Sequence, residues 1–217
     1  MKIGINITGV SYEDGSIYRY RDFEESLPSF NQYIVKPLLE EGHQIFFYIY
    51  TYDSPKRMKV LNSYNPIIKA KFIDQNKQIL RPLFHVQTHN LVSSLQMMLD
   101  EDLDVVIRAR FDMLFYKSPF TEYSFKWDKV NFLWKEPEYH HLPLVNDTFF
   151  TFPYRKLGDI ISTLMNSETS PFDGIKIGMH NIYRSMLQFM SEEDINILDD
   201  SYKTLSENTL YKLTRHG

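Results

Sequence analysis

The chain has 217 residues, of which 24 are basic and 28 acidic, giving a formal net charge of −4 at pH 7. No basic tract interrupts this balance, so nucleic acid is not expected as a main partner. Cysteine is absent, which excludes disulfides, cysteine nucleophiles and cysteine-rich zinc sites, and suits a reducing compartment. No apolar run approaches the ~18 residues of a membrane span, and the N-terminus is too polar for a signal peptide. We therefore expect a cytoplasmic protein with no membrane span.

The first half of the chain predicts alternating strands and helices. Lys2–Val10 alternates isoleucine with small or polar residues, which is typical of a strand. Apolar residues then recur at helical spacing from Phe23 to Leu38. Pro37 should kink this helix, and Gly42 should end it. Buried strands at 44–51 and 70–73 should flank a helix that begins after the turn at 53–55.

The second half adds further strands and helices without a clean break. A helix over Phe84–Leu99 should end at an acidic cluster, since acidic residues oppose the helix dipole at a C-terminus. Val105–Ile107 then predicts a buried strand. Further strands are expected at 130–134 and 148–152, and helices at 154–164, 182–190 and 205–213.

This order of elements predicts the α/β class. The first half is a βαβαβαβ series, which favours a Rossmann-like, mostly parallel mixed sheet with helices on both faces. The sequence shows no linker, low-complexity segment or internal repeat. A single domain over 1–217 is therefore expected.

The stretch DVVIRARFDMLF, residues 104–115, carries the main candidate site. A buried parallel strand should end near Ile107, and open α/β sheets bind ligands beyond the carboxyl ends of their strands. Arg108 and Arg110 offer planar, forked donors for phosphate. Asp112 is a hard oxygen ligand suited to Mg²⁺ or Mn²⁺. The alternative is a surface ion pair between Arg110 and Asp112.

Familiar phosphate and hydrolase motifs are missing from the sequence. There is no G-x-G-x-x-G fingerprint, no G-x-x-x-x-G-K-[ST] loop, no G-x-S-x-G elbow and no H-E-x-x-H pair. The remaining interpretation for phosphate and metal is a nucleotide whose base lies near the first strands and whose diphosphate lies near Arg108–Asp112. Arg81, just before a predicted helix, is a further candidate for phosphate binding.

Four segments carry a resemblance to a known family: IGINITGV with the Tyr/Arg loop after it, YIYTYDS, VIRARFDMLF and VNDTFFTFP. The chain resembles GT-A-fold glycosyltransferases of the nucleotide-diphospho-sugar transferase superfamily. It is especially similar to the small glycosyltransferase domains of large algal DNA viruses. The resemblance implies a nucleotide-binding half at 1–116 and an acceptor-side half at 117–217. A viral origin would place the protein in the host cytoplasm.

The resemblance also implies roles for individual residues. Gly9 and Val10 would contact the nucleotide base through their backbone, and Asp53 would lie near the base or ribose. Asp112 would be the remaining carboxylate of the family's metal-binding D-x-D, with Arg110 in place of the first Asp. His180 would be a C-terminal ligand to Mn²⁺ or Mg²⁺. The candidates to neutralise the diphosphate are Arg19, Arg21 and Arg110.

The function implied is sugar transfer from a nucleotide-diphosphate sugar, expected to be UDP-linked, to a glycan or other hydroxyl acceptor. The reaction is expected to be metal-assisted and inverting. Asp147 is the candidate base for the acceptor hydroxyl, and its alternative role is that of a turn residue. A non-catalytic nucleotide-sugar or glycan-binding module is the second hypothesis, favoured by the missing first Asp. A metal-dependent phosphohydrolase ranks last, because it needs several convergent carboxylates.

Overall fold

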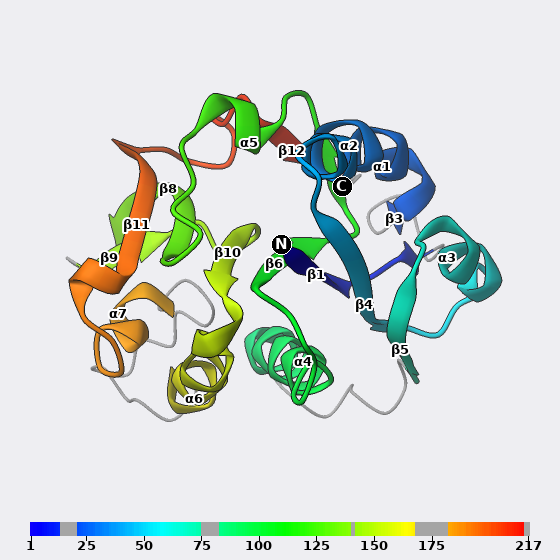
Figure 1. The fold of residues 1–217 in the computed structure, drawn as a ribbon, viewed down its shortest axis with the longest axis horizontal. Helices are drawn as coiled ribbons and strands as arrows, with labels where there is room; N and C mark the ends of the chain where they lie inside the picture. Colours follow the sequence, from blue (N-terminus) through cyan, green and yellow to red (C-terminus); the bar gives the residue numbers. More distant parts are fainter. Residues whose placement is uncertain (14–20, 75–82, 140–141, 168–181, 215–217) are drawn as a thin grey trace.

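The computed structural model describes residues 1–13, 21–74, 83–139, 142–167 and 182–214. An eight-stranded mixed sheet forms the centre, with helices on both faces (Figure 1). Its strands run in the order β11-β8-β10-β6-β1-β4-β5, and β9 pairs with β8. Their bounds are β1 Lys2–Gly9, β4 Gln44–Tyr52, β5 Ile67–Ile73, β6 Val105–Arg110, β8 Val130–Tyr139, β9 Leu142–Val145, β10 Phe150–Pro153 and β11 Ile195–Tyr202.

Strand directions divide this sheet into a parallel part and a mixed part. β5, β4, β1 and β6 are parallel neighbours. β10 runs antiparallel to both β6 and β8, and β11 is parallel to β8. The chain starts in the middle at β1, builds outward through β4 and β5, and then returns to the other side of β1 as β6. The strand order thus reverses between β1 and β6, which is where open α/β sheets bind ligands.

Helices cover the two faces of the sheet in two groups (Figure 1). One face carries α1 (Phe23–Phe30), a π-helical turn η1 (Asn31–Val35), α2 (Lys36–Glu40), α3 (Arg57–Ser63) and α5 (Pro119–Glu122). The other carries α4 (Leu83–Gln96), α6 (Leu157–Ser167) and α7 (Ile182–Met186). The 3-10 turns are η3 (Tyr154–Lys156) and η5 (Glu192–Asp194), and the short strands are β2 (Tyr12–Glu13), β3 (Arg21–Asp22), β7 (Met113–Phe115) and β12 (Tyr211–Leu213).

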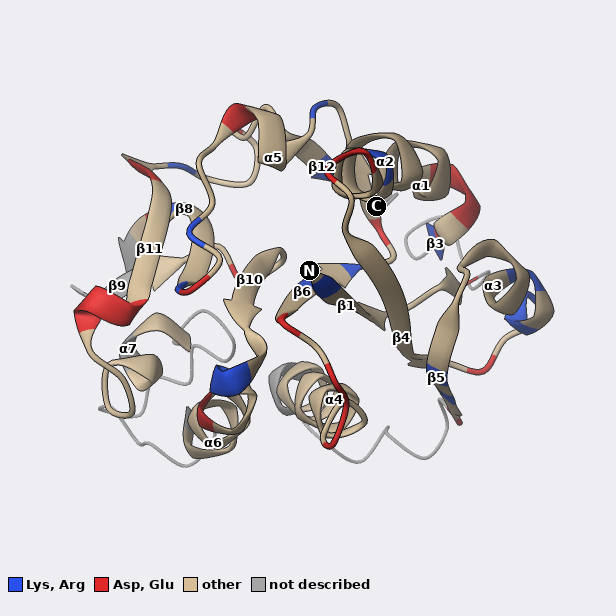
Figure 2. Ribbon diagram, in the orientation of Figure 1, with Lys and Arg blue, Asp and Glu red and all other residues tan. Residues whose placement is uncertain are grey.

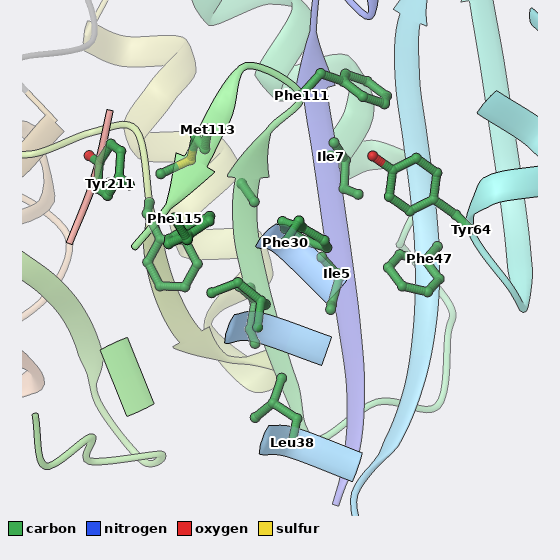
Figure 3. Packing of buried hydrophobic residues seen from close by; sticks show 14 of the residues in the cluster. Ile5, Ile7, Phe30, Leu38, Phe47, Tyr64, Phe111, Met113, Phe115 and Tyr211 are labelled. Carbon is green, nitrogen blue, oxygen red and sulfur yellow. The ribbon is translucent and has the colours of Figure 1, made fainter. Parts of the chain in front are cut away.

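Each face of the sheet packs on its own hydrophobic cluster. Ile5 and Ile7 of β1 meet Phe30, Phe47 and aromatic neighbours on the first face (Figure 3). On the second face β1 carries Gly4, where an added Cβ would lie 2.6 Å from Met98 Cε and 2.7 Å from Leu103 Cδ1. The chain that links α4 to β6 therefore packs directly on β1 there.

Charged residues lie mainly around the periphery of the ribbon, with both signs interspersed (Figure 2). All charged residues of the loop between α4 and β6 are acidic, namely Asp100, Glu101, Asp102 and Asp104. This loop precedes β6 and so lies at the amino edge of the parallel strands. Within the described ranges, no helix is both long and apolar enough to cross a membrane.

Most predicted elements are confirmed. β1, β4 and the helices through Phe23–Leu38 and 83–96 match the hydrophobic patterns. The strand predicted at Val105–Ile107 continues to Arg110. The helix predicted at 205–213 is wrong, because residues 211–213 form β12 and pair with β7. Its leucine spacing resembled that of a helix, but Tyr211–Leu213 is too short a strand to show its own alternation.

Candidate functional site

Gly9 ends β1 at the carboxyl edge of the sheet. Its φ of +110° is a conformation that only glycine adopts readily, and no atom of the described residues lies within 4 Å of where a Cβ would stand. The Gly9 carbonyl accepts a hydrogen bond of 2.8 Å from the Thr51 hydroxyl. That hydroxyl also accepts one of 3.1 Å from the Ser11 backbone N–H. β4 therefore holds the backbone on either side of half-buried Val10, and the Gly9 end stays open.

Arg110 and Asp112 form a buried, bidentate ion pair beside this strand end. Arg110 is the register partner of Thr8, so it lies next to the end of β1. Arg110 Nε donates to Asp112 Oδ1 over 2.8 Å, and Arg110 Nη2 to Asp112 Oδ2 over 2.7 Å. The two side chains are only 12% and 5% exposed. The pair is thus not on the surface, unlike the alternative raised from the sequence.

Arg108 lies inside the sheet, because β6 continues past Ile107. It is buried, and its Nη1 donates to the Thr148 carbonyl. This contact follows from the register, since Phe150 of β10 pairs with Arg108. Arg108 Nε is buried without a hydrogen-bond partner among the described residues. Arg108 therefore links β6 to the segment before β10 and keeps one donor unused.

Asp147 joins this cluster from the connection between β9 and β10, where it is buried. Its charge acts on both arginines. Burial and the neighbouring Arg110 lower the pKa of Arg108 to about 10, although Asp147 and Asp112 oppose that shift. Burial also disfavours the charge on Arg110, but Asp112 and Asp147 outweigh burial and raise its pKa. Both arginines are therefore cations near neutral pH, balanced by two carboxylates.

Two residues flank Asp147 and share a buried hydrogen-bond network. Asn146 Oδ1 accepts from Thr148 Oγ1 over 2.9 Å and from the Tyr211 hydroxyl over 3.0 Å. The Tyr211 and Thr148 hydroxyls also contact one another. Tyr211 comes from β12, which pairs with β7 just after Asp112. Sequence reasoning missed Tyr211, since a lone tyrosine near the C-terminus gives no signal of a site.

Unpaired polar atoms gather around the same network. Among the described residues, six have a buried side-chain nitrogen or oxygen without a hydrogen-bond partner, and four of these belong here. Interiors rarely leave such atoms unpaired, so a local concentration of them is typical of a place that receives water or a ligand. The four are Arg108 Nε, Trp134 Nε1, Asn146 Nδ2 and Thr214 Oγ1. Arg108 contacts the network through the Thr148 carbonyl, Trp134 through the Tyr211 ring, and Asn146 belongs to it. Thr214 contacts the neighbouring Asp112, to whose carbonyl its backbone N–H donates.

The other candidates from the sequence lie outside this cluster. Asp53 follows β4 at the same edge, but it is exposed and lies 3.9 Å from Arg57. Arg21 lies in β3, 3.9 Å from Glu13. Arg19, Arg81 and His180 fall outside the described residues. The structure therefore brings together Gly9, Arg108, Arg110, Asp112 and Asp147.

A divalent cation finds few ligands in this cluster. In the part of the chain that the structure describes, no three His, Asp or Glu side chains converge as a metal site would require. Both oxygens of Asp112 accept from Arg110. A metal ion at Asp112 would have to share this carboxylate with the guanidinium. A metal ion at Asp112 would therefore need further ligands besides this carboxylate.

Comparison with known proteins gives no indication of function. The sequence matches no protein-family model, and no curated protein is similar enough to count as a relative. What the chain can do therefore has to be argued from the sheet edge, its buried charges and its unpaired polar atoms.

Proposed function

We propose that this protein is a GT-A-like glycosyltransferase that moves a sugar from a nucleotide-diphosphate sugar to a hydroxyl acceptor such as a glycan. The observation that carries the proposal is the buried set of two arginines and two carboxylates, Arg108, Arg110, Asp112 and Asp147, beside the point where the strand order reverses. Ligands of α/β sheets bind at this edge. UDP is the nucleoside diphosphate we expect.

The donor half of the proposed site is built from the ends of β1 and β6. The open backbone at Gly9 leaves room for close approach of a flat base, with Val10 beside it. Arg110 lies next to that strand end, and a guanidinium pairs with phosphate oxygens through two parallel hydrogen bonds. A bound diphosphate would compete with Asp112 for Arg110. The ion pair of the ligand-free protein would thus keep the arginine ordered for its substrate.

The reaction needs a base on the acceptor and charge stabilisation on the leaving group. In the proposed inverting step, the acceptor oxygen bonds to the anomeric carbon as Asp147 takes the hydroxyl proton. The bond between the anomeric carbon and the diphosphate oxygen breaks, and its electron pair leaves with the nucleoside diphosphate. Arg108 and Arg110 would stabilise the charge that grows on that group.

Mn²⁺ or Mg²⁺ remains part of the proposal as an added source of positive charge, held by Asp112 and, beyond the described residues, by His180. No step is assigned to the metal, because Asp112 is already ion-paired. The same pairing gives a reason to keep one alternative. A protein in which Asp112, the remaining carboxylate at the position of the family's D-x-D, is already paired with a cation suits a nucleotide-sugar or glycan-binding module without catalysis.

Thermal unfolding with UDP, GDP, CDP and their sugars, with Mn²⁺ or with EDTA, tests donor binding. A ligand at ~100 times its dissociation constant adds about 2.7 kcal/mol, which is about 5–10 °C in a chain of this size. We expect such a shift for UDP species, and its loss in Arg110→Gln. The matched control is Arg155→Gln, since Arg155 is exposed and follows β10 at the opposite edge. No shift with any nucleotide would contradict the proposal.

Catalysis is tested separately by following nucleoside diphosphate release with ³¹P NMR. Asp147→Asn should still bind the donor while it loses at least 100-fold in turnover, in the range typical of a missing general base. Binding without turnover in the unmodified protein would instead establish the non-catalytic module. Phosphate release from simple esters, with no acceptor present, would indicate a phosphohydrolase.

A further inference from the structure

Asp147 is held between two residues that share one anchor. Asn146 and Thr148 flank it in the chain, and both contact the hydroxyl of Tyr211. Asn146 also donates its backbone N–H to the Trp134 carbonyl over 3.1 Å. The backbone on both sides of Asp147 is thus tied to the interior. The Tyr211 hydroxyl contacts both flanking residues, in addition to the direct hydrogen bond from Thr148 Oγ1 to Asn146 Oδ1.

The same segment also holds the turn that carries Asp112. β12 pairs with β7, with Tyr211 opposite Phe115. The Thr214 backbone N–H then donates to the Asp112 carbonyl over 2.8 Å. Tyr211 packs with Phe115 at a ring-centroid distance of 5.4 Å and is wholly buried (Figure 3). Residues 211–214 therefore contact both carboxylate-bearing segments of the cluster, from more than sixty positions away in the sequence.

We propose that Tyr211 is a positioning residue for Asp147, and that residues 211–214 set where Asp147 stands relative to the Arg110–Asp112 pair. The catalytic consequence rests on the proposed sugar transfer. The anchoring itself does not, and it can be measured on its own. Tyr211 touches no reacting atom in this scheme, because its hydroxyl is used by Asn146 and Thr148.

The hydroxyl protons explain why removal of the Tyr211 oxygen alone should disturb the segment 146–148. Burial raises the pKa of Tyr211, so the phenol stays protonated near neutral pH and can donate. Tyr211 and Thr148 have one hydroxyl proton each, and Asn146 Oδ1 is an acceptor for both. Removing the Tyr211 oxygen leaves Asn146 one donor short in a buried setting. We therefore expect the segment 146–148 to shift, although the aromatic packing of the ring is retained.

Tyr211→Phe is the test, because it removes that oxygen and keeps the ring between Phe115 and Trp134. The matched control is Tyr48→Phe. Tyr48 is also buried, and its hydroxyl donates to Glu101 over 3.0 Å in the loop at the opposite edge. Hydrogen exchange of residues 144–149 is measured first, on the protein without ligand. We expect faster exchange of this segment in Tyr211→Phe, and no change there in Tyr48→Phe.

The second measurement is turnover of the nucleotide sugar that gives the largest thermal shift. Misplacing a catalytic group by about 1 Å costs up to ~100-fold in rate, so we expect kcat to fall at least 10-fold in Tyr211→Phe. The KM for the donor should stay within twofold, because the arginines are untouched. Unchanged exchange, or an equal loss of kcat in both variants, would overturn the positioning role. If the unmodified protein turns over no donor while the exchange difference appears, the proposed function fails and the anchor stands.

Discussion

Gly9 shows how a single residue can shape the edge where the proposed donor binds. Its φ of +110° lies in a region that side chains with a Cβ rarely adopt, although there is space for one. We expect Gly9→Ala to lower the free energy of unfolding by about 1–3 kcal/mol, through backbone strain rather than through a clash. Urea unfolding at constant m-value measures this loss.

Gly158 provides the matched control, because it lies in the first turn of α6 with no positive φ, and no atom in the described part of the chain lies within 4 Å of an added Cβ. Gly158→Ala should stabilise the protein by about 0.5–1 kcal/mol, since alanine loses less backbone entropy in a helix. If Gly9→Ala proved as harmless as Gly158→Ala, the strain at the end of β1 would be refuted.

At the level of residues, the sequence predicts which side chains carry charge at the site but not how they pair. Arg110 and Asp112 are recognisable because they follow a buried strand. The distance between the two side chains and their burial cannot be predicted in this way, since two residues that form a surface ion pair could have the same sequence. Arg108 shows the limit most clearly. Three further residues of β6 place it inside the sheet, and a boundary error of that size is ordinary when strand ends are read from hydrophobicity.

α1 illustrates how one side chain can begin an element and fasten it. Asp22 is the N-cap of α1 and accepts from the Glu24 backbone N–H over 3.1 Å, and its other oxygen accepts from Lys56. Asp22→Ala should cost about 1–2 kcal/mol of the free energy of unfolding, because α1 loses its cap as well as the ion pair. Asp22→Asn keeps a capping oxygen and should cost less than half as much. Thermal unfolding of the two variants compares these losses directly. An equal loss in both would mean that the charge, not the cap, matters.

Elements with long apolar patterns are the ones that the sequence predicts correctly. β1 and β4 are buried over most of their length, and the helices after β1 keep one apolar stripe from Phe23 to Leu38. β12 and β7 have three residues each, and their stability comes from pairing with each other. β11 was missed because its residues are half exposed and acidic, INILDDSY, so no buried run marks it.

At the scale of the whole molecule, the site is assembled from parts that are far apart in the chain. The end of β1, the end of β6, the start of β10 and the C-terminal strand meet at one edge. The sequence predicts that the first two lie at the same edge, because the carboxyl ends of parallel strands meet at one edge of a sheet. The sequence contains nothing that places Tyr211 beside Asn146, since that contact depends on the pairing of β12 with β7.

Asp199 makes the free energy of unfolding depend on pH in the acid range. Its carboxylate, on β11, is bonded to Tyr123 earlier in the chain and to Ser201 and Lys203 after it. Its carboxylate accepts from Ser201 Oγ over 2.6 Å, from Tyr123 over 3.3 Å and from Lys203. Burial alone would raise the pKa of Asp199, but Lys203 and the two hydrogen bonds from Ser201 outweigh burial and lower the pKa from 3.8 to about 2. The folded state thus favours the charged form. This stabilisation is complete above pH 4 and is lost as the pH falls toward 2.

Asp199→Asn should therefore lower the free energy of unfolding by about 1–2 kcal/mol at pH 7, after allowance for solvent screening. The difference from the unmodified protein should shrink below pH 4 and be small at pH 2, where the carboxyl is about half protonated in the folded state and almost fully protonated in the unfolded state. Urea unfolding across pH 2–7 measures it. Asp159→Asn, at an exposed position on α6, should change stability by no more than ~0.5 kcal/mol at either end. A pH-independent loss in Asp199→Asn would show that shape, and not charge, holds β11 in place.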